Sequence, residues 1–280
     1  MRLDLATAGR GPSRPFLGTT SASGRQPRPL RRTHNRADGK MTDMALILVT
    51  GASTGLGYNT ANALADDGHD VVVHVRNQAR LAAAGDAARW KGVVMGDFAE
   101  LDEIRGVARQ TSRFGRFDAV IHNAGTMNSP EAITVNTVAP YILTALLEKP
   151  ARLIYLSSSM HRAGSTDLRR LTAGTGSYSD SKLWVTTLAL AVASRWAGTS
   201  SHAVDPGWVA TRMGGAGAPD DLTAGHQTQV WLVTHRDVTP GTGGYWYHQQ
   251  AQTPHPAAQD EEFQAHLIEV LESHTGVPLD

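Results

Sequence analysis

The sequence of 280 residues contains no cysteine. This absence excludes disulfide bonds, cysteine-ligated zinc, iron–sulfur clusters and a thiol nucleophile. It also fits a reducing compartment, and we expect the cytoplasm. Long hydrophobic runs are lacking as well: the best candidate, residues 183–194, has 12 residues and includes Thr and Ser, whereas a membrane span needs about 20 apolar residues. The sequence therefore predicts no membrane-spanning segment.

An excess of one charge sign is also lacking, because 26 Lys and Arg balance 26 Asp and Glu. Residues 1–40 nevertheless hold nine basic and two acidic residues, while residues 41–280 hold 17 basic and 24 acidic ones. The acidic balance of the longer part argues against nucleic-acid binding. Residues 1–40 are rich in Arg, Gly, Ser and Pro, which predicts disorder. Three interpretations of these residues are open. One is that the translation start is assigned too far upstream, with Met41 or Met44 the true first residue; the others are a disordered tail and an Arg-rich organelle-targeting peptide.

From residue 45 onward, short apolar runs alternate with amphipathic segments. The runs predict strands at 45–50, 70–75, 92–95, 118–122, 152–156 and 201–204, and a last strand that includes 244–247. Helices are expected at 58–67, 102–113, 131–148, 178–196 and 260–274. Repeated strand–helix–strand units predict an α/β fold. We expect residues 41–280 to form a single doubly wound domain, with a central parallel sheet of about seven strands and helices on both faces.

A glycine-rich segment, Thr50-Gly-Ala-Ser-Thr-Gly-Leu-Gly57, lies between the first predicted strand and the first helix. Its glycines permit a tight turn and let the backbone approach a pyrophosphate, and the helix that follows offers free N–H groups to that anion. This position favours a dinucleotide site over a plain turn. The residues expected to bind the cofactor here are Gly51, Ser53, Thr54, Gly55, Leu56 and Gly57.

Arg76 follows the second predicted strand. It lies roughly 20 residues past the glycines, where an Asp or Glu would bind the ribose 2′-hydroxyl of NAD. An Arg suits the 2′-phosphate of NADP instead, and such a contact contributes about 1.5–3 kcal/mol. The alternative is an Arg on a solvated loop. The sequence therefore predicts that NADP(H) is preferred over NAD(H).

Tyr178 and Lys182 are four residues apart in a predicted helix and share one of its faces. A positive charge about 4 Å from a phenol would lower its pKa by roughly three units from 10, toward neutral pH. The pair therefore indicates a general acid or base. The alternative is a surface Tyr beside a solvated Lys.

Residues from about 45 to 250 resemble the short-chain dehydrogenase/reductase family of NAD(P)-dependent oxidoreductases with a Rossmann fold. Motifs of that family occur here in its order. They are the glycine turn Thr50–Gly57, Asp97 after the third strand, Asn123-Ala124-Gly125 after the fourth, Ser157-Ser158 after the fifth, Tyr178-x-x-x-Lys182, and Asp205-Pro-Gly-Trp-Val-Ala-Thr211 after the sixth.

The resemblance implies that Tyr178 exchanges a proton with the substrate oxygen and that Lys182 lowers its pKa and holds the nicotinamide ribose. Ser158, the second serine of its pair, would hydrogen-bond the substrate oxygen. Asn136 would anchor a proton-relay water; the alternative is a polar residue at a helix start. The remaining cofactor contacts that the resemblance implies are Asp97, Phe98, Asn123, Ala124, Gly125, Pro206, Gly207, Val209 and Thr211.

The family's chemistry implies hydride transfer between NADP(H) and a small carbonyl or secondary alcohol substrate. No metal is expected, and the assembly is expected to be a homodimer or homotetramer. An extended sugar-nucleotide epimerase or dehydratase is disfavoured because only 98 residues follow Lys182. A non-enzymatic NADP-binding regulator is disfavoured because Ser158, Tyr178 and Lys182 are all present. His161, between the serines and Tyr178, is expected to be exposed on a loop.

Overall fold

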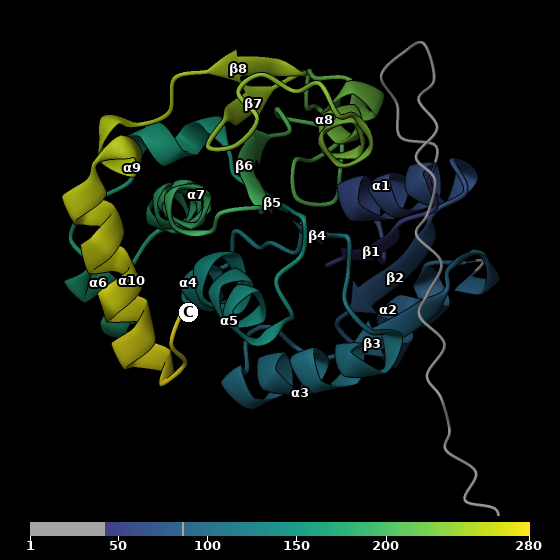
Figure 1. The fold of residues 1–280 in the computed structure, drawn as a ribbon, viewed down its shortest axis with the longest axis horizontal. Helices are drawn as coiled ribbons and strands as arrows, with labels where there is room; N and C mark the ends of the chain where they lie inside the picture. Colours follow the sequence, from purple (N-terminus) through teal and green to yellow (C-terminus); the bar gives the residue numbers. More distant parts are fainter. Residues whose placement is uncertain (1–42, 86) are drawn as a thin grey trace, which may run out of the picture. The chain divides into compact units, whose positions relative to one another are not determined.

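Strands and helices alternate along the chain in the computed structural model, which describes residues 43–85 and 87–280 (Figure 1). The predictions for residues 1–40 lie outside this described part. Its strands form one sheet in the order β3-β2-β1-β4-β5-β6-β7-β8. The strands are β1 (Leu46–Val49), β2 (Asp70–Val75), β3 (Gly92–Met95), β4 (Ala119–His122), β5 (Arg152–Leu156), β6 (Ser200–Asp205), β7 (Tyr245–Tyr247) and β8 (Gln250–Gln252).

Neighbouring strands from β3 to β7 are parallel, and β8 pairs antiparallel with β7. The predicted α/β fold is therefore confirmed, but the sheet has one strand more than the seven expected. β8 consists of two glutamines and an alanine, all exposed, so no apolar run indicates it. The turn before it places His248 and Gln249 at positive φ, a conformation usually signalled by Gly or Asn.

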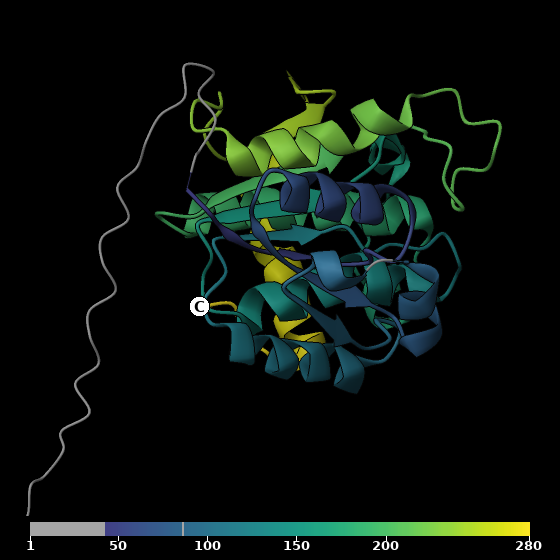
Figure 2. The same ribbon diagram turned by 90° about the vertical axis from the view of Figure 1, so that its right-hand side faces the viewer.

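Helices cover both faces of the sheet (Figure 2). The buried residues divide into two clusters: α3, α5, α7 and α10 pack on one face, and α1 and α8 pack on the other. The principal helices are α1 (Gly55–Asp66), α2 (Gln78–Ala83), α3 (Leu101–Thr111), α4 (Glu131–Ile133), α5 (Ala139–Leu146), α6 (Arg169–Thr172), α7 (Tyr178–Arg195), α8 (Leu222–Thr234), α9 (Pro256–Gln259) and α10 (Glu261–Thr275).

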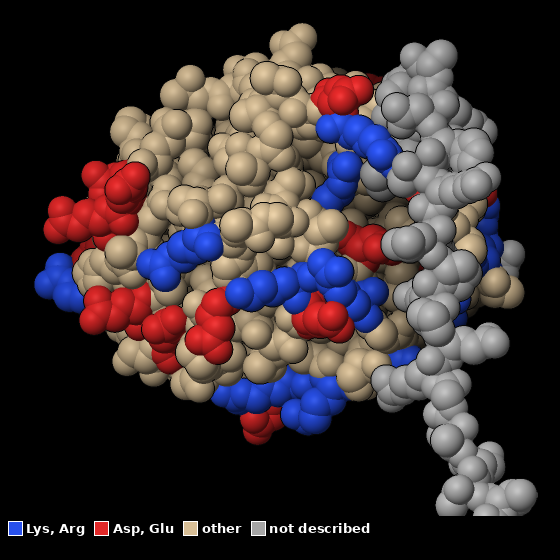
Figure 3. Space-filling view, in the orientation of Figure 1, with Lys and Arg blue, Asp and Glu red and all other residues tan. Residues whose placement is uncertain are grey.

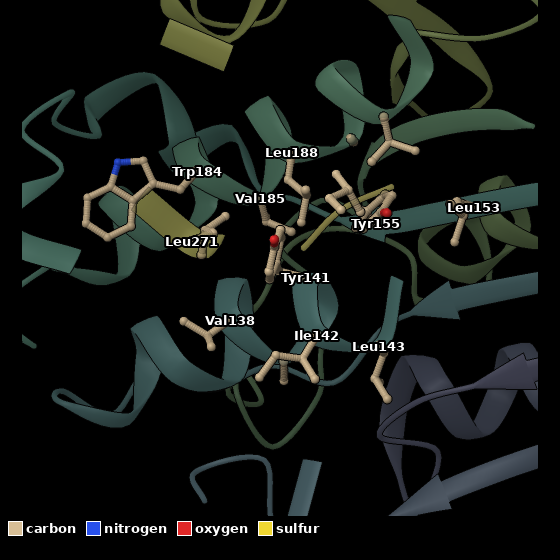
Figure 4. Packing of buried hydrophobic residues seen from close by; sticks show 14 of the residues in the cluster. Val138, Tyr141, Ile142, Leu143, Leu153, Tyr155, Trp184, Val185, Leu188 and Leu271 are labelled. Atoms are coloured by element: carbon tan, nitrogen blue, oxygen red, sulfur yellow. The ribbon is translucent and has the colours of Figure 1, made fainter. Parts of the chain in front are cut away.

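The core between α5 and α7 fixes the helix that carries Tyr178 and Lys182 (Figure 4). Tyr141, Trp184 and Leu188 are fully buried there, and the hydroxyl of Tyr141 donates a hydrogen bond to the carbonyl of Val277 (2.6 Å). Nearly all of α7 from residue 180 to residue 192 is buried. Since α10 packs along α7, the C-terminal segment also supports this helix.

Within the described residues, no helix combines the length and apolar character that crossing a membrane requires. Figure 3 shows basic side chains interspersed with acidic ones on the face in view, and acidic side chains along α10. Among the described residues, this face therefore shows no single large basic surface of the kind that binds a phosphate backbone.

Candidate active site

The motifs singled out in the sequence meet at one edge of the sheet, because the strands that carry them are neighbours. β1, β4, β5 and β6 lie side by side and parallel, so their carboxyl ends share an edge. The chain order reverses between β1 and β4, since β2 and β3 extend the sheet on the other side of β1. In open α/β sheets, such a switch point is where ligands bind.

The glycine turn after β1 is locked against the segment Asn123–Gly125 after β4. The hydroxyl of Thr50 accepts hydrogen bonds from the backbone N–H groups of Asn123 (2.9 Å) and Ala124 (3.0 Å). Gly51 has a φ of +67°, and a Cβ atom there would lie 2.7 Å from Cα of Ala124. Only glycine permits this approach, so the two predicted cofactor segments form one surface.

The amino end of α1 presents its backbone N–H groups at this surface. Thr54 is the N-cap, its side chain makes no capping hydrogen bond, and the first turn contains no acidic residue. The helix dipole and these N–H groups suit a phosphate. Thr211, from the segment after β6, lies beside the turn, with Cγ2 3.3 Å from where a Cβ atom on Gly55 would be. The residues present therefore fit the pyrophosphate of a dinucleotide.

His74 in β2 supports the same turn, and the sequence reasoning missed it. Its Nδ1 accepts a hydrogen bond from the N–H of Gly51 (3.2 Å), so Nε2 carries the proton and donates to the carbonyl of Gly96 (2.8 Å). The ring stacks on Phe98 at 3.8 Å between centroids. Phe98, expected to contact the cofactor, thus buries its side chain against His74. A histidine inside the apolar run of β2 was the available signal.

Arg76 and Asp97, both predicted to contact the cofactor, form an ion pair with each other. Nε of Arg76 lies 2.7 Å from Oδ2 of Asp97, and half of the Arg76 side chain is exposed. The other carboxylate oxygen of Asp97 accepts a hydrogen bond from the N–H of Ala99 (3.0 Å). The pair lies at the ends of β2 and β3, beyond the glycine turn.

The two serines after β5 have different partners. The hydroxyl of Ser157 is buried and hydrogen-bonded to that of Thr186 (2.6 Å). The hydroxyl of Ser158 accepts from the N–H of Met160 (3.2 Å), and it is near enough to the phenol of Tyr178 to act on the pKa of that phenol. Ser158 is therefore the serine that can act together with Tyr178.

Tyr178 is the first residue of α7, and a buried carboxylate fixes that helix start. Ser177 and Asp180 form a capping box, in which the hydroxyl of Ser177 accepts from the N–H of Asp180 and Oδ2 of Asp180 accepts from the N–H of Ser177 (2.7 Å). Oδ1 of Asp180 accepts from the N–H of Ser165 (2.7 Å), and Arg170 lies 3.0 Å from Oδ2. The sequence reasoning missed Asp180, although Ser-x-x-Asp before an apolar run signals it.

Lys182 shares the helix face of Tyr178, as the spacing predicts, and is buried. Its Nζ lies 5.5 Å from the centre of the Tyr178 ring and donates a hydrogen bond to the carbonyl of Leu156 (2.7 Å). Burial lowers the pKa of Lys182 to about 8, and the negative charge of Asp205 opposes this. Asp205 is itself buried at the end of β6, where it accepts hydrogen bonds from the N–H of Gly207 and the phenol of Tyr245.

The predicted lowering of the pKa of Tyr178 by Lys182 is wrong for this structure. Burial raises the pKa of Tyr178; the hydrogen bond with Ser158 opposes the rise, and the charge of Asp205 adds to it. The expectation placed a full charge about 4 Å from the phenol oxygen. The structure instead buries both side chains, and burial disfavours the charged form of each.

Asn136 does not lie at a helix start but in a π-helical segment, Thr134–Val138, between α4 and α5. Its Oδ1 accepts from the N–H of Thr126 (2.8 Å), and its Nδ2 donates to the carbonyl of Thr126 (2.9 Å) and the hydroxyl of Ser181 (2.9 Å). A Cβ atom on Gly125 would lie 3.3 Å from Oδ1 of Asn136 and 3.7 Å from Nζ of Lys182. The side chain of Asn136 thus joins the loop after β4 to α7.

His161 is buried rather than exposed, which corrects the expectation. The loop that carries it begins with a 3₁₀ turn, Ser159–Ala163, and is tied to the chain near residue 255. Nε2 of His161 accepts a hydrogen bond from the N–H of His255 (2.9 Å), and Nδ1 is 2.7 Å from the carbonyl oxygen of Ser158. His255 is 94 residues away along the chain, so local sequence could not reveal this contact.

The segment after β6 returns to the sheet at Asp220. Val209 and Asp220 form a β-bridge, and Oδ2 of Asp220 accepts a hydrogen bond from the N–H of Trp208 (2.6 Å). Gly207, with a φ of +81°, approaches this carboxylate closely. The two ends of the loop 210–219 are therefore joined at their base. This arrangement holds Val209 and Thr211 near the glycine turn.

Comparisons with known proteins agree with this geometry. The model of the short chain dehydrogenase family matches residues 45–221. The short-chain dehydrogenase chyC of Penicillium rubens is 37% identical over 84% of this chain and 99% of its own. An uncharacterized protein from Mycobacterium paratuberculosis has a TM-score of 0.73 at 23% identity, over 89% of this chain and 100% of that one.

A blue fluorescent protein from a metagenomic library, solved in complex with NADPH, has a TM-score of 0.61 at 19% identity, over 72% of this chain and 95% of that one. These two structures share the fold. The family match and the relative from Penicillium extend across the switch point, the glycine turn and the Tyr178–Lys182 pair. The chain belongs to the short-chain dehydrogenase/reductase family of NAD(P)-binding Rossmann oxidoreductases.

Proposed function

We propose that the protein interconverts a carbonyl compound and a secondary alcohol with NADP(H). The observation that carries this proposal is the placement of Tyr178 beside Ser158 and Lys182: the hydroxyl of Ser158 acts to lower the pKa of the phenol, and the ammonium of Lys182 lies 5.5 Å from the centre of the ring. The two hydroxyl groups lie at the carboxyl edge of the sheet, where the family places its chemistry. When bound, the nicotinamide supplies or accepts the hydride.

Tyr178 acts as the general acid in the reducing direction. Because burial raises its pKa above 10, the phenol is protonated at neutral pH and can donate to the oxygen of a ketone or aldehyde. Ser158 donates a second hydrogen bond to that oxygen. Two donors aimed at one oxygen stabilise the negative charge that develops there as the carbonyl is reduced.

Lys182 and Asn136 hold the surroundings of this acid in place. The ammonium of Lys182 is anchored on the carbonyl of Leu156, which leaves two of its three N–H groups for a ribose hydroxyl and the phenol. Asn136 anchors Thr126 and Ser181, so the loop after β4 and the first turn of α7 keep a fixed separation. A side chain at position 125 would contact both Asn136 and Lys182, so Gly125 leaves the space beside these two side chains free.

A Tyr178→Phe variant tests the proposal. We expect it to bind NADPH normally and to lose at least about a hundredfold in kcat for ketone reduction, since general acid catalysis contributes about 10²–10⁴. Tyr141→Phe is the matched control: its buried phenol donates a hydrogen bond to the carbonyl of Val277 in the core, so the variant should lose stability but keep kcat. Near-normal turnover by Tyr178→Phe contradicts the role of Tyr178. A wild-type protein that binds NADPH and reduces no carbonyl compound supports the regulator instead.

Arg76 supports the proposed preference for NADP(H), as does the NADPH found in a structure of the same fold. The ion pair with Asp97 engages Nε and orients the guanidinium near the end of β2. We expect Arg76→Gln to weaken NADPH binding about tenfold and to leave NADH binding unchanged, because only the 2′-phosphate is lost as a partner. Titration of both cofactors at one ionic strength measures this. Equal effects on both cofactors contradict the assignment.

A further inference from the structure

The ring of His161 is hydrogen-bonded to the backbone of Ser158. The carbonyl oxygen of Ser158 accepts two hydrogen bonds, one from the backbone N–H of His161 (3.0 Å) and one from Nδ1 of its ring (2.7 Å). The side chain of Ser158 accepts a third, from the N–H of Met160. The orientation of this residue is therefore set by its neighbours on both its carbonyl and its hydroxyl side.

The partners of His161 define which nitrogen carries its proton. Nε2 faces the N–H of His255, which can only donate, so Nε2 is the unprotonated acceptor. Nδ1 then carries the proton and donates to Ser158. The ring is thus neutral, with both nitrogens satisfied and no exposed surface. Burial lowers the pKa of His161. The hydrogen bond to the carbonyl of Ser158 and the charge of Asp205 oppose this, while Arg162 and His255 act in the same sense as burial.

The ring is also held from the side and from the C-terminal segment. It packs on the ring of Tyr245 at 4.6 Å between centroids, and Tyr245 in turn donates a hydrogen bond to Asp205. The neighbouring Arg162 donates to the carbonyl of Thr253 (2.6 Å). Segments that are about 90 residues apart in the chain therefore meet at this histidine.

We propose that His161 is a positioning residue, which orients Ser158 toward the substrate oxygen by bridging its carbonyl to the backbone of the C-terminal segment at His255. The inference rests on the proposed function, because it acts through the hydroxyl that Ser158 offers to substrate. Few side chains can bridge a carbonyl and an N–H at this distance. The role needs a donor and an acceptor at opposite ends of one short, flat group.

Three substitutions separate the two ends of this bridge. In His161→Asn the amide nitrogen stands near the place of Nδ1, so the bond to Ser158 is kept and the one to His255 is lost. In His161→Gln the amide stands near the place of Nε2, where its oxygen can accept from His255, and the bond to Ser158 is lost. His161→Phe keeps the ring on Tyr245 and loses both bonds.

We expect kcat for ketone reduction to fall about tenfold in His161→Gln and His161→Phe and no more than about threefold in His161→Asn, the fold-change that one hydrogen bond carries. NADPH affinity should stay within about twofold in all three, because the cofactor does not contact His161 in this proposal. The matched control is Arg162→Ala, which removes the hydrogen bond from Arg162 to the carbonyl of Thr253 between the same two segments. This variant should have lower thermal stability and an unchanged kcat. Should His161→Phe fail to fold, the comparison of Asn with Gln decides.

A double-mutant cycle with Ser158→Ala tests whether His161 acts through Ser158. If it does, His161→Gln lowers kcat in the wild type and has no further effect in Ser158→Ala. Equal losses in both backgrounds, or equal kcat in the Asn and Gln variants, overturn the inference while leaving the proposed function intact. If Ser158→Ala and Tyr178→Phe both retain full turnover, the proposed function fails and the inference fails with it.

Discussion

Three buried histidines in strands of the sheet should make the stability of the protein sensitive to mild acid. His74, His122 and His202 are each at most 3% exposed. Burial lowers their pKa values to about 4, about 3 and about 4, from an ordinary value of 6.5. His74 and His202 each accept hydrogen bonds from N–H groups through Nδ1, and His122 stacks on Tyr155. Protonation is disfavoured in the folded protein at all three.

The sign of the effect follows from which state binds protons first. Between pH 6.5 and about 4 the unfolded chain carries a proton on each of these histidines and the folded protein does not, so stability falls as the pH falls. Each histidine then contributes a loss of about 2 kcal/mol at pH 5 relative to neutral pH. The three together amount to about 6 kcal/mol, which is comparable to the whole stability of many domains, about 5–15 kcal/mol.

Urea unfolding at pH 7, 6, 5.5 and 5 measures this loss. Three protons bound on unfolding predict a slope of about 4 kcal/mol per pH unit near pH 5.5. His122→Phe, which keeps the stacking on Tyr155 and cannot be protonated, should reduce that slope by about a third. A free energy of unfolding that changes by less than about 1 kcal/mol between pH 7 and pH 5 refutes the reasoning.

Two further predictions concern the starts of the two helices at the site. Asp180→Ala should lower the free energy of unfolding by about 3 kcal/mol, because it removes the capping box and leaves the half-buried N–H of Ser165 unpaired; chemical denaturation measures this, and an unchanged midpoint contradicts it. Gly57→Ala should weaken NADPH binding at least about tenfold, because its Cβ atom would lie 2.7 Å from the carbonyl oxygen of Gly51 and displace the glycine turn. Calorimetric titration measures that loss. The control is Gly68→Ala, just past the far end of α1: its φ of +88° strains an alanine there, but nothing lies within 4 Å of the added Cβ atom, so NADPH affinity should be unchanged.

Local sequence could predict the elements whose signal lies within a few residues. The apolar runs of β2, β3 and β5 give strands with the bounds that the structure has. For β2 and β5, which lie inside the sheet, the reason is that strands buried on both faces are largely apolar. The glycine turn and the Tyr178–Lys182 pair could be predicted because both are defined by spacing within a few residues: glycines at a strand–helix turn, and two side chains four residues apart on one face of a helix. Asp180 was within reach of the same reasoning, since a capping box is a local pattern. β8 was not, because its two glutamines and one alanine are all exposed and the strand is defined by its pairing with β7.

The sequence by itself determined the fold class, the family and the residues that meet at the carboxyl edge of the sheet, because these depend on periodicity and on short motifs. Only the tertiary structure decided the electrostatics and the partners of those residues. It shows that the pKa of Tyr178 is raised, that Arg76 pairs with Asp97, and that His161 is buried between Ser158 and His255. Burial and contacts between distant segments set these properties, and neither can be deduced from the residues that are neighbours in the sequence.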